Sequence, residues 1–161
     1  MYREIDQIFE NRSAFNGTLY LCKSERHSPA DPSGYEGRYN GQGTNAYYLA
    51  DSPRACWYEI LGYNPNANYS DYSMWTVQVS GTFIDVGAIE GTKYVEPKEN
   101  GGWKPTQELS RKLRDESVLG FRYASRAAIQ KHSDGTCFCV YQKCLHLGAN
   151  DFSPIEWEPD I

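Results

Sequence analysis

The stretch GRYNGQGTNAYYLADSPRACWYEIL, residues 37–61, predicts a turn, a strand and a helix in immediate succession. Three glycines among its first seven residues allow positive φ angles and a close approach of the backbone to a ligand, which is the composition of a binding loop. The aromatic run 46–50 predicts a short buried strand. Ser52 and Pro53 then mark the start of a helix, as the N-cap and the first helical residue.

The helix that begins at Pro53 carries a carboxylate at the border of its buried face. At 100° per residue its apolar stripe consists of Cys56, Trp57, Ile60 and Leu61. Glu59 falls at the edge of this stripe, where a side chain is half removed from water. The spacing therefore makes Glu59 a candidate functional acid.

Length and composition predict one folded domain over residues 1–161, with an acidic, Pro-containing C-terminal tail at 148–161. The net charge is -5 and the isoelectric point about 5.2, so the chain has no basic field to attract phosphate backbones. This argues against general nucleic-acid binding. The high aromatic content, 14%, fits a folded domain with amphipathic rings in its surface or pocket.

The chain also lacks the signals of export and of membrane insertion. Its first fifteen residues contain acids and no apolar run, and no window approaches the length of a membrane span. The chain has five cysteines, an odd number, and most of them lie in apolar stretches of the sequence. This pattern predicts reduced thiols in the core. We therefore expect a cytoplasmic protein without membrane association.

Three cationic side chains, Lys23, Arg26 and His27, follow a predicted first strand at 18–22 and belong to a long polar loop. They are either a solvated surface or a cationic wall for a phosphorylated ligand. The three cysteines at 137, 139 and 144, with one nearby histidine, offer incomplete zinc spacing, because there is no C-x-x-C pair. Core cysteines are the better interpretation, and no metal site is expected.

Patterns farther along the chain predict further strands and a helix. Two strands, 74–79 and 82–86, are separated by Ser80-Gly81, the spacing of a hairpin. An amphipathic helix is predicted at 104–114, and a strand at 136–141. If 118–125 is extended, Phe121, Tyr123 and Ser125 share one face and Arg122 points the other way.

Four side chains form the most specific candidate set, namely Arg38 in the turn, Tyr48 on the strand, Glu59 on the helix and Ser125 downstream. Each has an ordinary alternative: a surface charge, a core tyrosine, a helix-surface acid and a turn hydroxyl. Together they supply an arginine, an aromatic hydroxyl, a half-buried carboxylate and a hydroxyl.

This set resembles the signature of the RES-domain family, which is named for its Arg, Glu and Ser. The resemblance rests on Gly37-Arg38-Tyr39-Asn40, Gly43-Thr44, Tyr48-Leu49-Ala50, Ser52-Pro53, Glu59 and the run Gly120-Phe121-Arg122-Tyr123-Ala124-Ser125. Two departures are that Glu36 stands where the family has the first glycine of its GGR motif, and that no Pro/Gly-rich run follows Ser125.

The resemblance implies an α+β fold, a compact mixed sheet with flanking helices, similar to ADP-ribosyltransferases and diphtheria-type toxins. It further implies a bacterial toxin that degrades NAD at the nicotinamide–ribose bond, as a glycohydrolase or a phosphorylase, with no cofactor beyond NAD as substrate. The alternatives are an ADP-ribosyltransferase that modifies a protein and a non-catalytic nucleotide-binding module. The expected partner is a cognate antitoxin or immunity protein, and a homodimer stays open.

In that chemistry Glu59 would stabilise an oxocarbenium-like transition state. Arg38, with Arg26 beside it, would bind the pyrophosphate, because guanidinium groups bind phosphates bidentately. Tyr48 would stack on the nicotinamide cation. Ser125 would contact the ribose or nicotinamide, or orient the attacking water or phosphate. The expected binding set is completed by Asn40 and His27.

Overall fold

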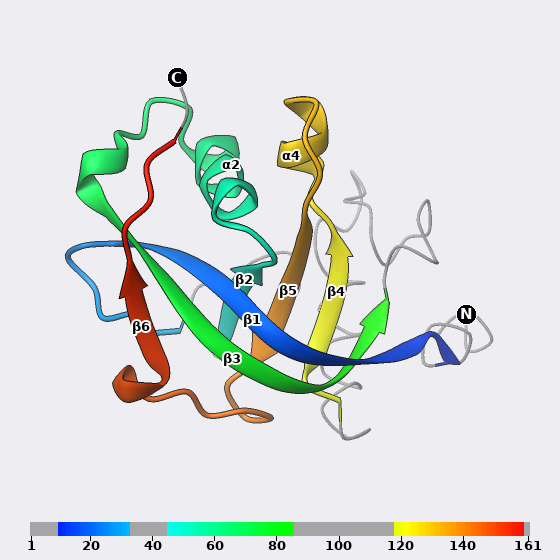
Figure 1. Ribbon diagram of the computed structural model, residues 1–161. Helices are drawn as coiled ribbons and strands as arrows, with labels where there is room; N and C mark the ends of the chain where they lie inside the picture. Colours follow the sequence, from blue (N-terminus) through cyan, green and yellow to red (C-terminus); the bar gives the residue numbers. More distant parts are fainter. Residues whose placement is uncertain (1–9, 33–44, 86–117, 160–161) are drawn as a thin grey trace, which may run out of the picture.

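The computed structural model describes residues 10–32, 45–85 and 118–159. Within these ranges the chain forms six strands and two α-helices (Figure 1). Their order is β1 (Arg12–Ser24), β2 (Ala46–Ala50), α2 (Pro53–Tyr63), β3 (Tyr72–Asp85), β4 (Gly120–Ala124), α4 (Arg126–Gln130), β5 (Thr136–Tyr141) and β6 (Phe152–Ile155).

Five of the described strands close into a barrel. The longest pairing joins β1 and β3, which run antiparallel from Arg12↔Ile84 to Ser24↔Tyr72. From β1 the ring continues through β2, β5 and β4 in antiparallel pairs, and β4 returns to β3 in parallel. β6 adds to β3 outside the ring. The expected mixed sheet with flanking helices is therefore present, and it is closed.

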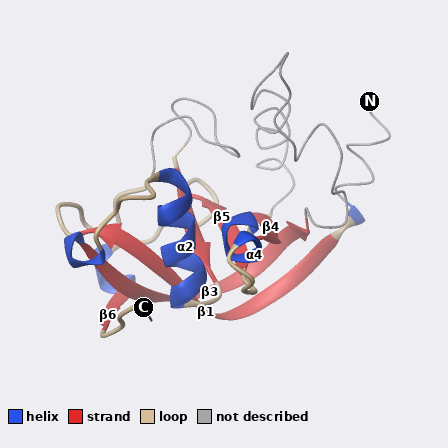
Figure 2. Ribbon diagram, turned by 90° about the horizontal axis from the view of Figure 1, so that it is seen from above, coloured by secondary structure: helices blue, strands red, loops and turns tan. Residues whose placement is uncertain are grey.

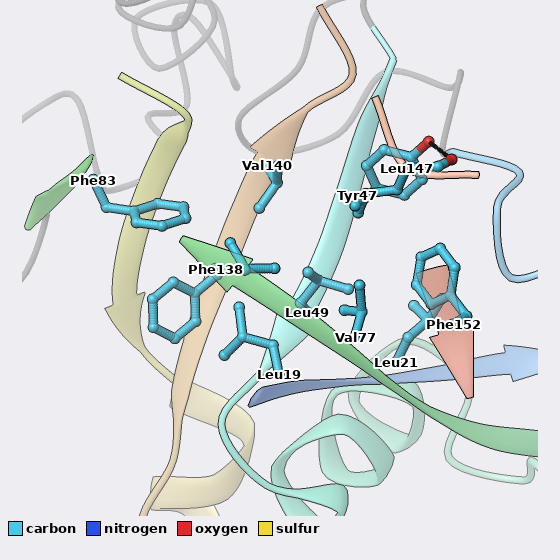
Figure 3. Close-up of a cluster of buried hydrophobic side chains, with 11 residues drawn as sticks. Leu19, Leu21, Tyr47, Leu49, Val77, Phe83, Phe138, Val140, Leu147 and Phe152 are labelled. Carbon is cyan, nitrogen blue, oxygen red and sulfur yellow. Dashed lines mark hydrogen bonds between the residues drawn. The ribbon is translucent and has the colours of Figure 1, made fainter. Parts of the chain in front are cut away.

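Alternate side chains of the strands fill the barrel, as period-two alternation requires (Figure 3). Leu19 and Phe83, from β1 and β3, are fully buried there. The rings of Phe83 and Phe138 meet edge to face with centroids 5.1 Å apart. The Tyr47 hydroxyl, which burial would otherwise leave without a partner, donates to the Leu147 carbonyl at 3.2 Å.

The opposite face of the strands carries the two helices. α2 and α4 lie side by side over the same side of the barrel in both views (Figures 1 and 2). The apolar stripe of α2 packs with Cys22, Met74 and Cys137 in a second buried cluster. Ser52 caps α2 by accepting a hydrogen bond from the Ala55 amide at 3.1 Å, and Pro53 is its first residue. The predicted helix start is confirmed.

The predicted hairpin at Ser80-Gly81 is wrong, because both residues lie inside the continuous strand β3 and pair with Asn16 and Phe15 of β1. The glycine serves a close contact and not a turn. A Cβ at Gly81 would lie 2.3 Å from a methyl carbon of Leu119, so the absent side chain makes room for the residue that precedes the neighbouring strand β4.

The other strand predictions have mixed outcomes. The strands at 46–50 and 136–141 are confirmed, and the strand at 18–22 is the middle of the longer β1. Arg122 points away from the face of Tyr123, as predicted, and lies 5.8 Å from the ring centroid of Phe138. The helix predicted at 104–114 lies outside the described residues.

The acidic C-terminal stretch is more integrated than a tail. Its residues Phe152–Ile155 form β6 against β3, and Phe152 is buried in the barrel core. The ring of Trp157 meets the ring of Tyr69 edge to face, with centroids 5.3 Å apart, and this contact holds the C-terminal segment against the domain. The apolar contacts of Phe152 and Trp157 therefore hold this segment on the domain although most of its residues are polar.

Gly120 gives a test of barrel closure. A Cβ at this position would lie 1.7 Å from the Cys139 carbonyl oxygen, a backbone atom that no side-chain rotation can move. We expect Gly120→Ala to lower the free energy of unfolding by about 3 kcal/mol. In α2, the matched control Gly62→Ala meets only Ala127 Cβ at 3.6 Å and is expected to be neutral or stabilising. Urea unfolding measures both, and equal effects would contradict the close packing.

Candidate active site

A cavity of about 400 Å³ lies where β1 and β2 separate. These two strands pair only at Tyr20↔Ala50. Beyond that pair, residues 21–24 of β1 stay with β3, and residues 46–49 of β2 stay with β5. Both segments line the cavity, together with residues of α2. The volume is within the range of small-molecule sites.

The wall of the cavity is rich in tyrosine. The rings come from β2, α2, β3 and β4 and belong to Tyr47, Tyr48, Tyr63, Tyr72 and Tyr123. The carboxylate of Glu59 and the cationic side chains of Lys23 and His27 also line it. π-faces and a carboxylate in one cavity favour a flat cationic ligand group, and the two basic side chains suit an anionic one.

The carboxylate of Glu59 is held by two donors that come from different elements. The Ser125 hydroxyl donates to Oε1 at 2.7 Å, and the Cys137 thiol donates to the same oxygen at 3.3 Å. Both of these donors bind Oε1. The half-buried acid predicted at the edge of the α2 stripe is therefore present, and its orientation is fixed through one oxygen.

Ser125 lies beneath Glu59 and is 0% exposed. Its hydroxyl accepts a hydrogen bond from the Ala128 amide at 3.1 Å, which caps α4, and gives its only proton to Glu59. Gly135 permits this close arrangement, because a Cβ there would lie 2.6 Å from Ala55 Cβ of α2. The structure thus brings Glu59 and Ser125 together, with the serine behind the acid.

Three thiols in the cavity wall are poor nucleophiles. Burial raises the pKa of Cys22 to about 12. Burial also raises the pKa of Cys56, and for Cys137 the negative charge of Glu59 adds to the effect of burial. These side chains are therefore S–H groups at neutral pH, and the thiolate needed for a cysteine nucleophile is not available.

The cationic residues divide into two groups. Lys23 lines the cavity half-buried, with its ammonium donating to the Asp31 carbonyl, and burial lowers its pKa against the opposing effect of the Asp31 charge. His27 lines the cavity near the surface, whereas Arg26 is exposed and is absent from the cavity wall in the described residues. Arg38 and Asn40 lie outside the described residues.

Sequence reasoning missed Tyr123 and Tyr72, which line the cavity, and treated Cys137 as an ordinary core thiol. Tyr123 could have been predicted, since the expected alternation placed it on the same face as Ser125, two residues away. Cys137 was not, because its meeting with Glu59 depends on how β5 sits beneath α2. Tyr48, in contrast, lies in the cavity wall as its candidate role requires.

A model of the RES domain family matches residues 13–156 of the chain. The chain belongs to the RES-domain family. Among solved structures, the crystal structure of the M. tuberculosis MbcT–MbcA toxin–antitoxin complex is similar, with a TM-score of 0.66 and 15% identity over 95% of this chain and 89% of that one. At this identity the likeness concerns the fold. The comparison with curated proteins finds no match.

In this RES domain Glu59 and Ser125, the acid and the serine of the predicted set, are in direct contact. The described residues contain no group of three or more His, Cys, Asp or Glu side chains placed to bind a metal ion. None of the helices in those residues has the length and apolar content that a membrane crossing requires. The likeness to ADP-ribosyltransferases stays a prediction.

The two serine caps give a matched test of the Glu59–Ser125 contact. Ser52→Ala removes only the cap of α2 and is expected to cost about 1 kcal/mol of unfolding free energy. Ser125→Ala removes a cap and a donor to a half-buried carboxylate, so we expect about 2–3 kcal/mol.

The excess cost of Ser125→Ala should disappear in a Glu59→Ala background, where no carboxylate remains to be satisfied. Urea unfolding of the four variants and the parent measures this coupling. An equal cost of Ser125→Ala in both backgrounds would show that the hydrogen bond contributes nothing.

Proposed function

We propose that this RES domain is a toxin that cleaves the nicotinamide–ribose bond of NAD and so depletes it. One observation carries the proposal: an oriented carboxylate stands in the wall of a tyrosine-rich cavity of small-molecule size. Membership of the RES-domain family and the fold likeness to a toxin–antitoxin complex support it.

The reaction needs a fixed negative charge near the ribose. When the bond from the ribose anomeric carbon to the nicotinamide nitrogen breaks, its electron pair leaves with nicotinamide, which becomes neutral. The positive charge then lies on the ribose as an oxocarbenium-like species. Glu59, held through Oε1, offers Oε2 to this charge or to a ribose hydroxyl. Water or phosphate adds to the anomeric carbon and releases a proton.

The remaining cavity groups suit the rest of the dinucleotide. Tyr48 and Tyr123 offer ring faces to the nicotinamide cation, which leaves the site as a neutral ring and so loses its attraction to them. Lys23 and His27 offer positive charge to the phosphates. Arg38 remains a predicted phosphate contact, and Asn40 a predicted member of the binding set. Pro32 and Ala46, which come before and after these two residues in the sequence, line the same cavity.

Ser125 acts in this proposal through Glu59 and not on the substrate. Its hydroxyl proton is given to Oε1, its oxygen accepts from the Ala128 amide, and the side chain is buried. This differs from the direct contact with ribose, nicotinamide or attacking water that the family resemblance suggested. The serine would align the acid, as a supporting residue does in a preorganised site.

A protein that depletes NAD must be inhibited in the cell that produces it. We therefore include a cognate antitoxin or immunity protein in the proposal, supported by the solved complex of similar fold. The site of action is the cytoplasm, where the NAD pool lies. An ADP-ribosyltransferase would use the same carboxylate and differ only in the acceptor, so product analysis separates the two activities.

The purified protein should convert NAD to nicotinamide and either ADP-ribose or, when phosphate is required, ADP-ribose 1″-phosphate. Glu59→Gln keeps the shape of the side chain and removes its charge, so we expect turnover to fall about 100-fold or more with unchanged thermal unfolding. Chromatography of incubations with and without phosphate measures the products. The matched control is Glu156→Gln, an exposed acid outside the cavity wall, which should retain full activity.

Intact NAD in every incubation of the parent protein would reject NAD cleavage. An ADP-ribosyl adduct on a protein, with little free ADP-ribose, would instead establish the transferase. Expression in a bacterial host should arrest growth for the parent and not for Glu59→Gln, and unimpaired growth with the parent would contradict the toxin.

A further inference from the structure

The thiol of Cys137 is the second donor to the carboxylate. Its Sγ lies 3.3 Å from Glu59 Oε1, within the range of a sulfur hydrogen bond, and the side chain is 3% exposed. Ser125 donates to the same oxygen, at 2.7 Å. Side chains from three elements therefore meet at Oε1: Glu59 from α2, Ser125 from the turn after β4, and Cys137 from β5.

The strand that carries Cys137 is paired on both sides. β5 is an inner strand of the sheet, and Cys137 pairs with Ala50 of β2 on one side and with Tyr123 of β4 on the other. The carboxylate of Glu59, by contrast, is at the end of a flexible side chain on α2. A thiol on a doubly paired strand is thus a fixed point against which the carboxylate can be held.

The protonation state of Cys137 favours the role of donor. Burial is the largest cause that raises its pKa, followed by the charge of Glu59, the hydrogen bond to Glu59 and the nearby thiol of Cys56 on α2. The other titratable groups that line the cavity are Cys22, Lys23, His27, Asp31, Tyr47, Tyr48, Tyr63, Tyr72 and Tyr123. The thiol keeps its proton at neutral pH, and an S–H group beside a carboxylate donates to it.

Because a single hydrogen bond lets a carboxylate pivot about the bonded oxygen, two donors from different directions restrict its rotation. We infer that Cys137 is a positioning residue that, with Ser125, locks Glu59 through Oε1 and leaves Oε2 for the ligand. The consequence for catalysis rests on the proposed NAD cleavage. The contact itself does not, since it is a property of the free protein.

The rival explanation is that Cys137 only fills space in the apolar cluster beneath α2. The two explanations make opposite demands on the side chain. Packing is preserved by valine, which is apolar and close in size, and is impaired by the polar hydroxyl of serine. Positioning is preserved by serine, which keeps a donor, and is lost with valine.

Steady-state kinetics of Cys137→Ser, Cys137→Val and Cys137→Ala test this choice. We expect the serine variant to stay within about twofold of the parent, and the other two to lose about three- to tenfold in kcat with KM nearly unchanged. Cys144→Ala, outside the cavity wall, controls for cysteine removal in general. Full activity of the valine variant together with a loss in the serine variant would overturn the inference.

A spectroscopic measurement tests the contact without NAD turnover. The S–H stretching band of Cys137 is obtained by infrared difference between the parent and Cys137→Ser. A thiol that donates to a carboxylate absorbs at lower frequency than a free one, so Glu59→Gln, with its weaker acceptor, should move the band upward. A band unmoved by Glu59→Gln would overturn the inference.

The two measurements separate the possible failures. If the parent does not consume NAD, the proposed function fails, and the band shift still decides whether Cys137 holds Glu59. If Cys137→Val does not fold, as thermal unfolding would show, the serine variant and the band shift carry the test.

Discussion

The pairing of β1 with β3 constrains the rest of the structure. Thirteen residues of β1 stay in register with β3, yet β1 meets the five-residue β2 at the single pair Tyr20↔Ala50. Strands twist, so a long strand bound along one edge diverges from a short neighbour on the other. The separation opens the sheet beside a filled barrel core. The cavity is thus a product of how the barrel closes, and its walls are the diverging strands.

The acid enters this opening because only two residues separate the end of β2 from the start of α2. The Ser52 cap and Pro53 fix the first turn of the helix, and Glu59 then falls over the outer face of the sheet. Removing a carboxylate partly from water is costly unless donors replace the water. Ser125 and Cys137 are those donors. The two hydrogen bonds that offset the desolvation cost of the Glu59 carboxylate are therefore the same ones that orient it.

Local signals in the sequence were sufficient for much of this arrangement. The cap at Ser52, the strand at 46–50 and the position of Glu59 at the edge of an apolar stripe follow from neighbouring residues, and the structure confirms them. Contacts between residues that are distant in the sequence could not be predicted from it. Gly81 resembled a turn because nothing in its neighbours reveals Leu119, which occupies the space above it. For the same reason Cys137 could be predicted as buried but not as a partner of Glu59.

The run Gly120-Phe121-Arg122-Tyr123-Ala124-Ser125 shows how a short motif encodes long-range contacts. Gly120 lets β4 approach the Cys139 carbonyl, and the strand then alternates between the two sides of the barrel. Arg122 faces the core ring of Phe138, while Tyr123 lines the cavity. The strand ends at Ser125, beneath Glu59. A shift of one residue in this register would exchange the two faces, so barrel closure and the orientation of the acid are set by the same pairing.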